Sequence, residues 1–150
     1  MIPESRPLRP SDPDPFFWIE LPGTTNNLGK FQKFILDHAK GHQIQVDITG
    51  KVELVLEEVL LNIMNHAYSG GQQGTIKAGC VFSDEGKFIV RIIDQGSPFD
   101  PSSIPEPDTT LSVEERNIGG LGIFLVRKLS DHVLYKRVDG QNILDIGFKI

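Results

Sequence analysis

The sequence has few of the residues on which several common kinds of site depend. Its 150 residues include a single cysteine, Cys80, so neither an intrachain disulfide nor a cysteine-rich zinc site can form. No apolar run approaches the roughly 20 residues that span a bilayer as a helix. The first residues alternate prolines and acids where a signal peptide needs an unbroken apolar stretch. We therefore expect a cytoplasmic protein that has no contact with a membrane.

Positive charge is also scarce. The formal net charge is -5 at pH 7, which argues against direct nucleic-acid binding, because that role needs a basic face to neutralise phosphates. Two nucleotide-binding motifs are missing as well: the sequence contains neither GxxxxGK[ST] nor GxGxxG. The P-loop and the Rossmann dinucleotide fold are therefore excluded.

The length suits one domain. Residues 1–15 contain five prolines and few large apolar side chains, which predicts a flexible segment before a domain at 16–150. Hydrophobic periodicity predicts helices at about 27–40, 48–69 and 121–130, and strands at 16–21, 75–82, 87–93, 133–137 and 143–150. This order predicts an α+β fold, a two-layer α/β sandwich whose mostly antiparallel sheet is covered on one face by three helices.

The helix expected at 48–69 is apolar nearly all round, which predicts that it is buried on most sides. Glu58 and Asn62 nevertheless share one of its faces, and Asn65 and His66 continue the same stripe. A polar stripe on a buried helix costs free energy unless it meets partners, water or a ligand. A solvated face or a stripe satisfied by a neighbouring loop explains it equally, and the pattern alone leaves these alternatives open.

Two glycine-containing segments are further candidates. Asp94 directly follows a predicted strand, and Gly96 comes two residues later. Such a pair forms a turn by default. It also places a carboxylate where it can accept a hydrogen bond from an exocyclic amine, and the glycine lets that group approach the backbone. Gly119, Gly120 and Gly122 precede a helical run. Their N–H groups and the helix dipole favour an anion, although a flexible hinge has the same composition.

The order and separation of these segments resemble a known superfamily. Residues 58–62, followed by 65–68, look like the N box of the GHKL (histidine-kinase-like) ATPases, whose domain is the Bergerat ATP-binding fold. Residues 94–101 resemble the first glycine box and residues 119–126 the second, on the far side of a proline- and acid-rich segment without periodicity. The resemblance covers roughly residues 16–150.

Three details are similar to the anti-sigma factor serine/threonine-protein kinases of bacteria. They are His-Ala-Tyr at 66–68, Pro-Phe-Asp-Pro at 98–101 and the compact single-domain length. One departure concerns the expected lid at 97–118, which is acidic at its centre and has Arg116 as its one basic residue. That departure bears on the rate of phosphate transfer more than on nucleotide binding.

The resemblance implies ATP and Mg²⁺ as ligands. Asn62 would bind the magnesium ion, and Glu58 would act as general base toward the attacking hydroxyl. Asp94 would hold the adenine amino group, with Gly96 giving access to it. Among the glycines, Gly120 and Gly122 would offer N–H groups to the phosphates. The other nucleotide-contacting positions that the resemblance implies are His66, Phe99, Gly119 and Leu121.

The function implied is that of an anti-sigma factor type serine/threonine-protein kinase. It would phosphorylate a small anti-anti-sigma (STAS) protein, bind a sigma factor and form a homodimer. Two alternatives remain open: an ATP-dependent protein-binding switch with little kinase activity, and a stand-alone histidine-kinase-type catalytic domain. A catalytic base at Glu58 favours the kinase over the switch, because a pure binder needs none.

Overall fold

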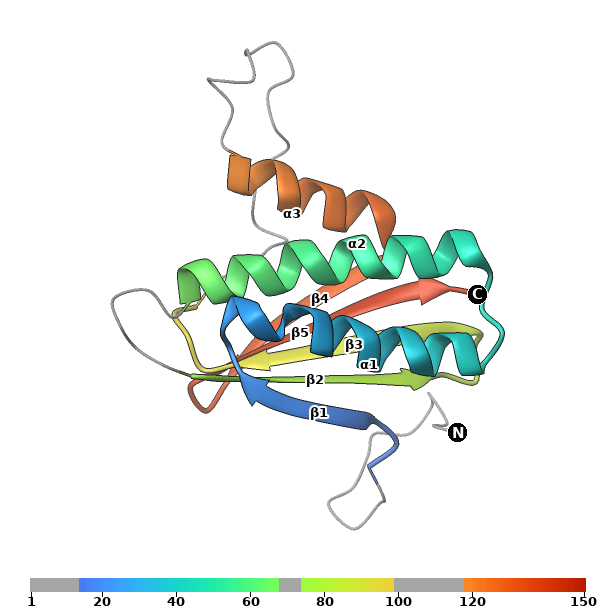
Figure 1. The fold of residues 1–150 in the computed structure, drawn as a ribbon, viewed down its shortest axis with the longest axis horizontal. Coiled ribbons are helices and arrows are strands. Elements are labelled where there is room, and N and C mark those ends of the chain that lie inside the picture. The colour runs from blue at the N-terminus through green and yellow to red at the C-terminus, as the bar shows by residue number, and fades with distance from the viewer. Residues whose placement is uncertain (1–13, 68–73, 99–117) are drawn as a thin grey trace.

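The computed structural model describes residues 14–67, 74–98 and 118–150 of the chain. These residues form five strands and three α-helices, with a short 3-10 turn η1 (Thr25–Asn27) before the first helix (Figure 1). The strands are β1 (Phe17–Pro22), β2 (Thr75–Phe82), β3 (Lys87–Asp94), β4 (His132–Val138) and β5 (Gln141–Lys149). The helices are α1 (Leu28–Gly41), α2 (Val46–Asn62) and α3 (Ile118–Leu129).

The strands form one antiparallel sheet in the order β1-β2-β3-β5-β4. Two hairpin turns are fixed by residues with positive φ. Gly86 (φ 74°) closes the turn between β2 and β3, and Asp139 (φ 50°) with Gly140 (φ 78°) closes the one between β4 and β5. Two consecutive positive φ values are the type I′ arrangement that matches the twist of a two-residue hairpin, which explains the Asp-Gly pair.

All three helices lie on the same side of the sheet, with α2 between α1 and α3 (Figure 1). The core fills the space between the two layers. From the sheet it takes every second residue of β2, β3 and β5, and from the helices the apolar stripes of α1 and α2 together with Val126 of α3. The predicted two-layer α+β fold, with helices on one face of an antiparallel sheet, is thereby confirmed. Among the described residues, no helix is long and apolar enough to cross a bilayer.

Two helix boundaries differ from the sequence prediction. The helix expected to continue to residue 69 is α-helical only to Asn62 and becomes a π-turn, η2 (Ile63–Ala67). A π-turn bonds each residue five positions along instead of four, so the stripe predicted from Glu58 to His66 does not continue straight beyond Asn62. The last helix begins at Ile118, three residues before the predicted start.

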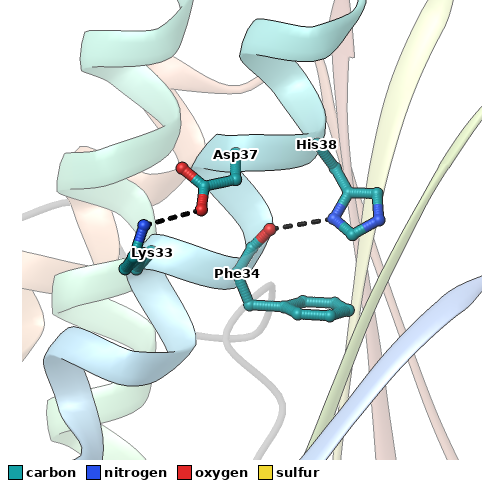
Figure 2. A network of polar contacts seen from close by, with 4 residues as sticks. All are labelled: Lys33, Phe34, Asp37 and His38. Atoms are coloured by element: carbon teal, nitrogen blue, oxygen red, sulfur yellow. Dashed lines mark hydrogen bonds and ion pairs between the residues drawn. The ribbon is translucent and has the colours of Figure 1, made fainter.

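His38 of helix α1 contacts the edge strand β1. His38 donates from Nδ1 to the carbonyl oxygen of Phe34 one turn earlier, at 3.0 Å, while Lys33 and Asp37 form an ion pair at 2.9 Å (Figure 2). The imidazole of His38 lies 4.6 Å from the ring of Phe17 of β1 and 4.7 Å from that of Phe34. The imidazole of His38 thus packs between α1 and the edge strand β1.

The sheet face away from the helices carries its own contacts. Arg91 of β3 and Asp145 of β5 form a two-pronged ion pair with nitrogen–oxygen distances of 2.7 and 2.8 Å, which raises the pKa of Arg91. The Trp18 ring of β1 lies on Gly79 of β2, in the space that a Cβ there would occupy. Only glycine therefore allows the indole to lie flat on this strand.

Candidate functional site

The ends of several elements meet at one edge of the fold. The register pairs Lys77 of β2 with Ile93 of β3 and Asp94 of β3 with Asn142 of β5. The start of β2, the end of β3 and the β4–β5 hairpin therefore lie together. The carboxyl end of α2 and the first turn of α3 lie at this same edge (Figure 1). The topology thereby brings the three predicted motifs, far apart in sequence, to one end of the molecule.

Glu58 and Asn62 lie one turn apart on α2, and both side chains are half-buried. Glu58 is in direct contact with α3: its carboxylate occupies the position that a Cβ on Gly122 would take. The two helices pack closely at this point because residue 122 has no side chain. The contact joins the first and third predicted motifs, and it gives Gly122 a steric role that the sequence reasoning did not foresee.

Asp94 is the buried end of the site. Its side chain is 3% exposed, and its Oδ1 accepts two hydrogen bonds, from the backbone N–H of Gly96 at 2.8 Å and from Nδ2 of Asn142 at 3.0 Å. A carboxylate removed from water needs such donors, because its burial without them is very costly. The turn after β3 thus folds back on its own aspartate, and β5 supplies the second donor.

Asn142 was not predicted as part of the site. It is 5% exposed, and it contacts Tyr135 and Arg137 of β4 as well as Asp94. The sequence contains an indication of its position: Asn142 precedes Leu144 by two residues and therefore shares the inward face of β5. A polar residue on the inward face of a strand whose other inward residues are apolar predicts a buried polar partner.

The glycine-rich segment is helical from its start. Gly119, Gly120 and Leu121 lie in the first turn of α3, where the first N–H groups of a helix have no intrahelical partner. Gly122 lies further in, and α-helical geometry directs its N–H to the carbonyl of residue 118. Gly119 and Gly120 therefore lie in the turn whose N–H groups can meet a phosphate, whereas Gly122 lies just beyond it, and the phosphate contacts expected of these glycines stay predictions.

Phe99 and the side chains of His66 and Leu121 lie beyond what the structure describes. Phe99 falls in 99–117, together with most of the expected lid, and the side chain of His66 is not described although its backbone belongs to η2. The flexible segment expected at 1–15 lies almost wholly outside the described residues.

The donor set at this edge suits magnesium bound jointly with phosphate. Asn62 supplies a hard amide oxygen, and the ranges 14–67, 74–98 and 118–150 contain no cluster of three His, Cys, Asp or Glu side chains that could hold a metal by themselves. Magnesium usually takes only one or two protein ligands and completes its shell with water and phosphate oxygens. The residues present therefore fit a magnesium ion that arrives with a nucleotide.

Curated proteins with similar sequences are named as kinases. The chain is 29% identical over 97 residues to "Serine-protein kinase RsbW" of Listeria monocytogenes, covering 62% of this chain and 61% of that protein. It is 29% identical over 93 residues to "Serine/threonine-protein kinase BtrW" of Bordetella bronchiseptica, covering 62% and 65%. The matched region thus spans less than two thirds of either relative.

Solved structures share the fold. The RsbU and RsbW domains of Rv1364c from Mycobacterium tuberculosis superpose with a TM-score of 0.65 at 14% identity, covering 91% of this chain and 33% of that one. A histidine kinase domain from Erythrobacter litoralis gives 0.52 at 20% identity, covering 82% and 59%. The family model described as "Histidine kinase-like ATPase domain" matches residues 21–148, nearly all of the described domain. This chain therefore belongs to the histidine kinase-like ATPase family, as its three motifs indicated.

Proposed function

We propose that the protein binds ATP and transfers its γ-phosphate to a serine or threonine of a partner protein, as an anti-sigma factor type kinase. The observation that carries the proposal is the contact between Glu58 and the glycine-rich helix α3 at Gly122. A carboxylate thereby lies beside the helix whose first turn suits phosphates, at the same edge of the fold as the carboxyl end of β3, where Asp94 suits an adenine.

The two ends of the nucleotide would be held by different chemistry. Asp94 is a buried hydrogen-bond acceptor, which fits the 6-amino donor of adenine. Gly119 and Gly120 fit the phosphates, because the first turn of a helix presents uncovered N–H groups and the positive end of its dipole. The expected lid at 97–118 would connect these two ends.

Glu58 would act as the general base. It would accept the proton of the partner's hydroxyl while the hydroxyl oxygen forms its bond to the γ-phosphorus and the bond from that phosphorus to the leaving ADP oxygen breaks. Asn62, one turn further along α2, would hold the magnesium ion. Magnesium supplies charge neutralisation on the phosphates when bound. Positioning by these side chains and helix ends would provide most of the remaining catalysis.

The substrate proposed is a small STAS-type anti-anti-sigma protein, and a sigma factor is a second proposed partner. The support is that RsbW and BtrW, to which the chain is similar, are named as serine or serine/threonine kinases.

We also propose a cytoplasmic homodimer that pairs through β1 and α1. Phe17 on this edge strand is 53% exposed, and among the strands that the structure describes β1 has a neighbour on one side only. Phe17→Asp should therefore lower the molar mass measured by analytical ultracentrifugation.

The test is phosphate transfer from labelled Mg·ATP to each STAS-type protein of the source organism. Wild type should label a serine or threonine. Glu58→Ala should bind ATP with unchanged affinity and lose at least about 100-fold in transfer rate, the low end of what general bases contribute. Asp94→Asn should lose ATP binding, because it places an amide donor opposite the amino group.

The products distinguish the alternatives. A phosphohistidine product would favour a histidine-kinase-type catalytic domain, and ATP binding without any transfer would favour a protein-binding switch. Transfer by Glu58→Ala at the wild-type rate would remove Glu58 from the mechanism. Calorimetry that finds undiminished ATP affinity in Asp94→Asn would overturn the adenine assignment.

A further inference from the structure

The hydrogen bonds that hold Asp94 come from a neighbouring hairpin as well as from its own turn. Asn142 of β5 pairs with Asp94 in the register of β3 and β5, and both side chains are on the inner face of the sheet. The Nδ2 of Asn142 donates to Oδ1 of Asp94 at 3.0 Å, with both residues at least 95% buried. Such a pair in a water-poor interior is electrostatically stronger than the same pair in solvent.

The orientation of the Asn142 amide follows from the chemistry of its neighbours. Arg137 Nη1 lies 3.1 Å from one amide terminus, and because a guanidinium has donors only, that terminus is the oxygen. Tyr135 donates its hydroxyl to the same oxygen at 2.6 Å. The amide nitrogen therefore faces Asp94, and from this orientation Asn142 can only donate to the carboxylate.

The same hairpin fixes the backbone that follows Asp94. Arg137 Nη1 donates to the carbonyl oxygen of Gly96 at 2.6 Å, and Asn142 Nδ2 donates to that of Ser97 at 2.9 Å. The turn from 94 to 97 is thus tied to β4 and β5 at two carbonyls in addition to the aspartate. A ligand that binds here does not have to order the turn, which reduces the entropic cost of its binding.

We propose that Asn142, held by Tyr135 and Arg137, is a positioning residue that determines the base specificity of the site. Its amide nitrogen donates to Oδ1 of Asp94, which leaves Oδ2 to face the ring of the bound purine. This step rests on the proposed binding of an adenine nucleotide. A carboxylate oxygen accepts but does not donate, so it attracts the 6-amino group of adenine and repels the 6-oxo group of hypoxanthine. Without Asn142, of the two donors described only the N–H of Gly96 holds Oδ1, so the carboxylate is less firmly oriented and this preference weakens.

The experiment compares ADP with IDP by calorimetry in Mg²⁺ on the full chain, since neither nucleotide can donate a γ-phosphate. Wild type should prefer ADP. Asn142→Leu should lose about 10- to 100-fold in ADP affinity, the range for a hydrogen bond to a charged group, and almost nothing for IDP.

A control on the opposite face of the same two strands separates positioning from stability. Asp145→Asn weakens the ion pair to Arg91 between β3 and β5 and should lower the thermal midpoint while leaving the ADP-to-IDP ratio unchanged. If Asn142→Leu does not fold, Arg137→Leu takes its place, with an expected fall of several-fold in that ratio.

The outcomes for the two proposals are distinguishable. Wild type that fails to bind ADP would overturn the proposed function itself. The positioning role alone would be overturned if wild type prefers ADP but the variant at Asn142 or Arg137 keeps the same ADP-to-IDP affinity ratio, for example by losing affinity for both nucleotides equally.

Discussion

Gly122→Ala should separate stability from catalysis in a single substitution. The added methyl group would occupy the position of the Glu58 carboxylate. Alanine is favoured over glycine within a helix by about 0.8–1 kcal/mol, and forcing a flexible side chain about 30° away from its preferred rotamer costs about 0.5–1.5 kcal/mol. These terms nearly cancel, so the free energy of unfolding should stay within about 1 kcal/mol of the wild-type value. The carboxylate, however, must leave its place.

Phosphate transfer should therefore fall although the fold persists. If Glu58 is the general base, its displacement should approach the effect of removing it, a loss on the order of 100-fold or more in rate. The assay measures transfer from labelled Mg·ATP beside urea unfolding of the same preparation. Gly50→Ala in α2 is the matched control, because a Cβ at residue 50 meets nothing within 4 Å. It should gain about 0.8–1 kcal/mol and keep its rate.

Two results would refute this reasoning. A Gly122→Ala protein that transfers phosphate at the wild-type rate would mean that the position of Glu58 against α3 does not matter for the reaction. A loss of unfolding free energy above about 2 kcal/mol would mean that the backbone, and not the side chain of Glu58, moves to accommodate the methyl group. In a Glu58→Ala background the clash is gone, and Gly122→Ala should show the helix-propensity gain alone.

Two further predictions concern the sheet. Gly79→Ala displaces the ring of Trp18, the one tryptophan of the chain, so it should cost about 1–3 kcal/mol and shift tryptophan emission to longer wavelength; an unshifted spectrum would contradict the packing. Burial raises the pKa of Cys80 from 9.0 to about 12, so the thiol contributes stability below pH 9 that is lost as the pH rises from 9 to 12. The free energy of unfolding should fall by up to about 1.4 kcal/mol per pH unit there, and Cys80→Ala should lack that component of the slope.

The sheet could be predicted because its determinants are local. The Asp139–Gly140 pair encodes a turn that needs two positive φ values, and alternation of apolar residues on either side sets the strands. The ends of the helices were harder to predict from the sequence. Nothing in the apolar run around Ile63 distinguishes an α-helix from the π-turn of η2, because apolar residues such as Ile63 and Met64 suit the buried side of either. The early start of α3 opposes local preference, since glycine is a poor helix former.

The candidate site was predictable motif by motif but not as a set of contacts. Residue types and spacing singled out Glu58, Asn62 and Asp94, and the resemblance to the GHKL ATPases supplied their expected roles. The contact of Glu58 with Gly122, in contrast, joins residues 64 positions apart in sequence. Asn142 was missed for the same reason, because its partner Asp94 lies 48 residues away. Periodicity gives the face on which a residue lies, but only the register of β3 and β5 places these two opposite each other.

The two ends of the proposed nucleotide site are supported in different ways, and this has a functional consequence. Asp94 is held by backbone and side-chain donors of a hydrogen-bonded sheet, so its geometry exists before any ligand arrives. The phosphate end depends on how α3 lies against α2, with Glu58 and Gly122 in contact and Val126 of α3 fully buried. Two packed helices can shift relative to each other at lower cost than a strand can leave a sheet centre. We therefore expect recognition of the base to be rigid, and any adjustment that accompanies phosphate transfer to occur between α2 and α3.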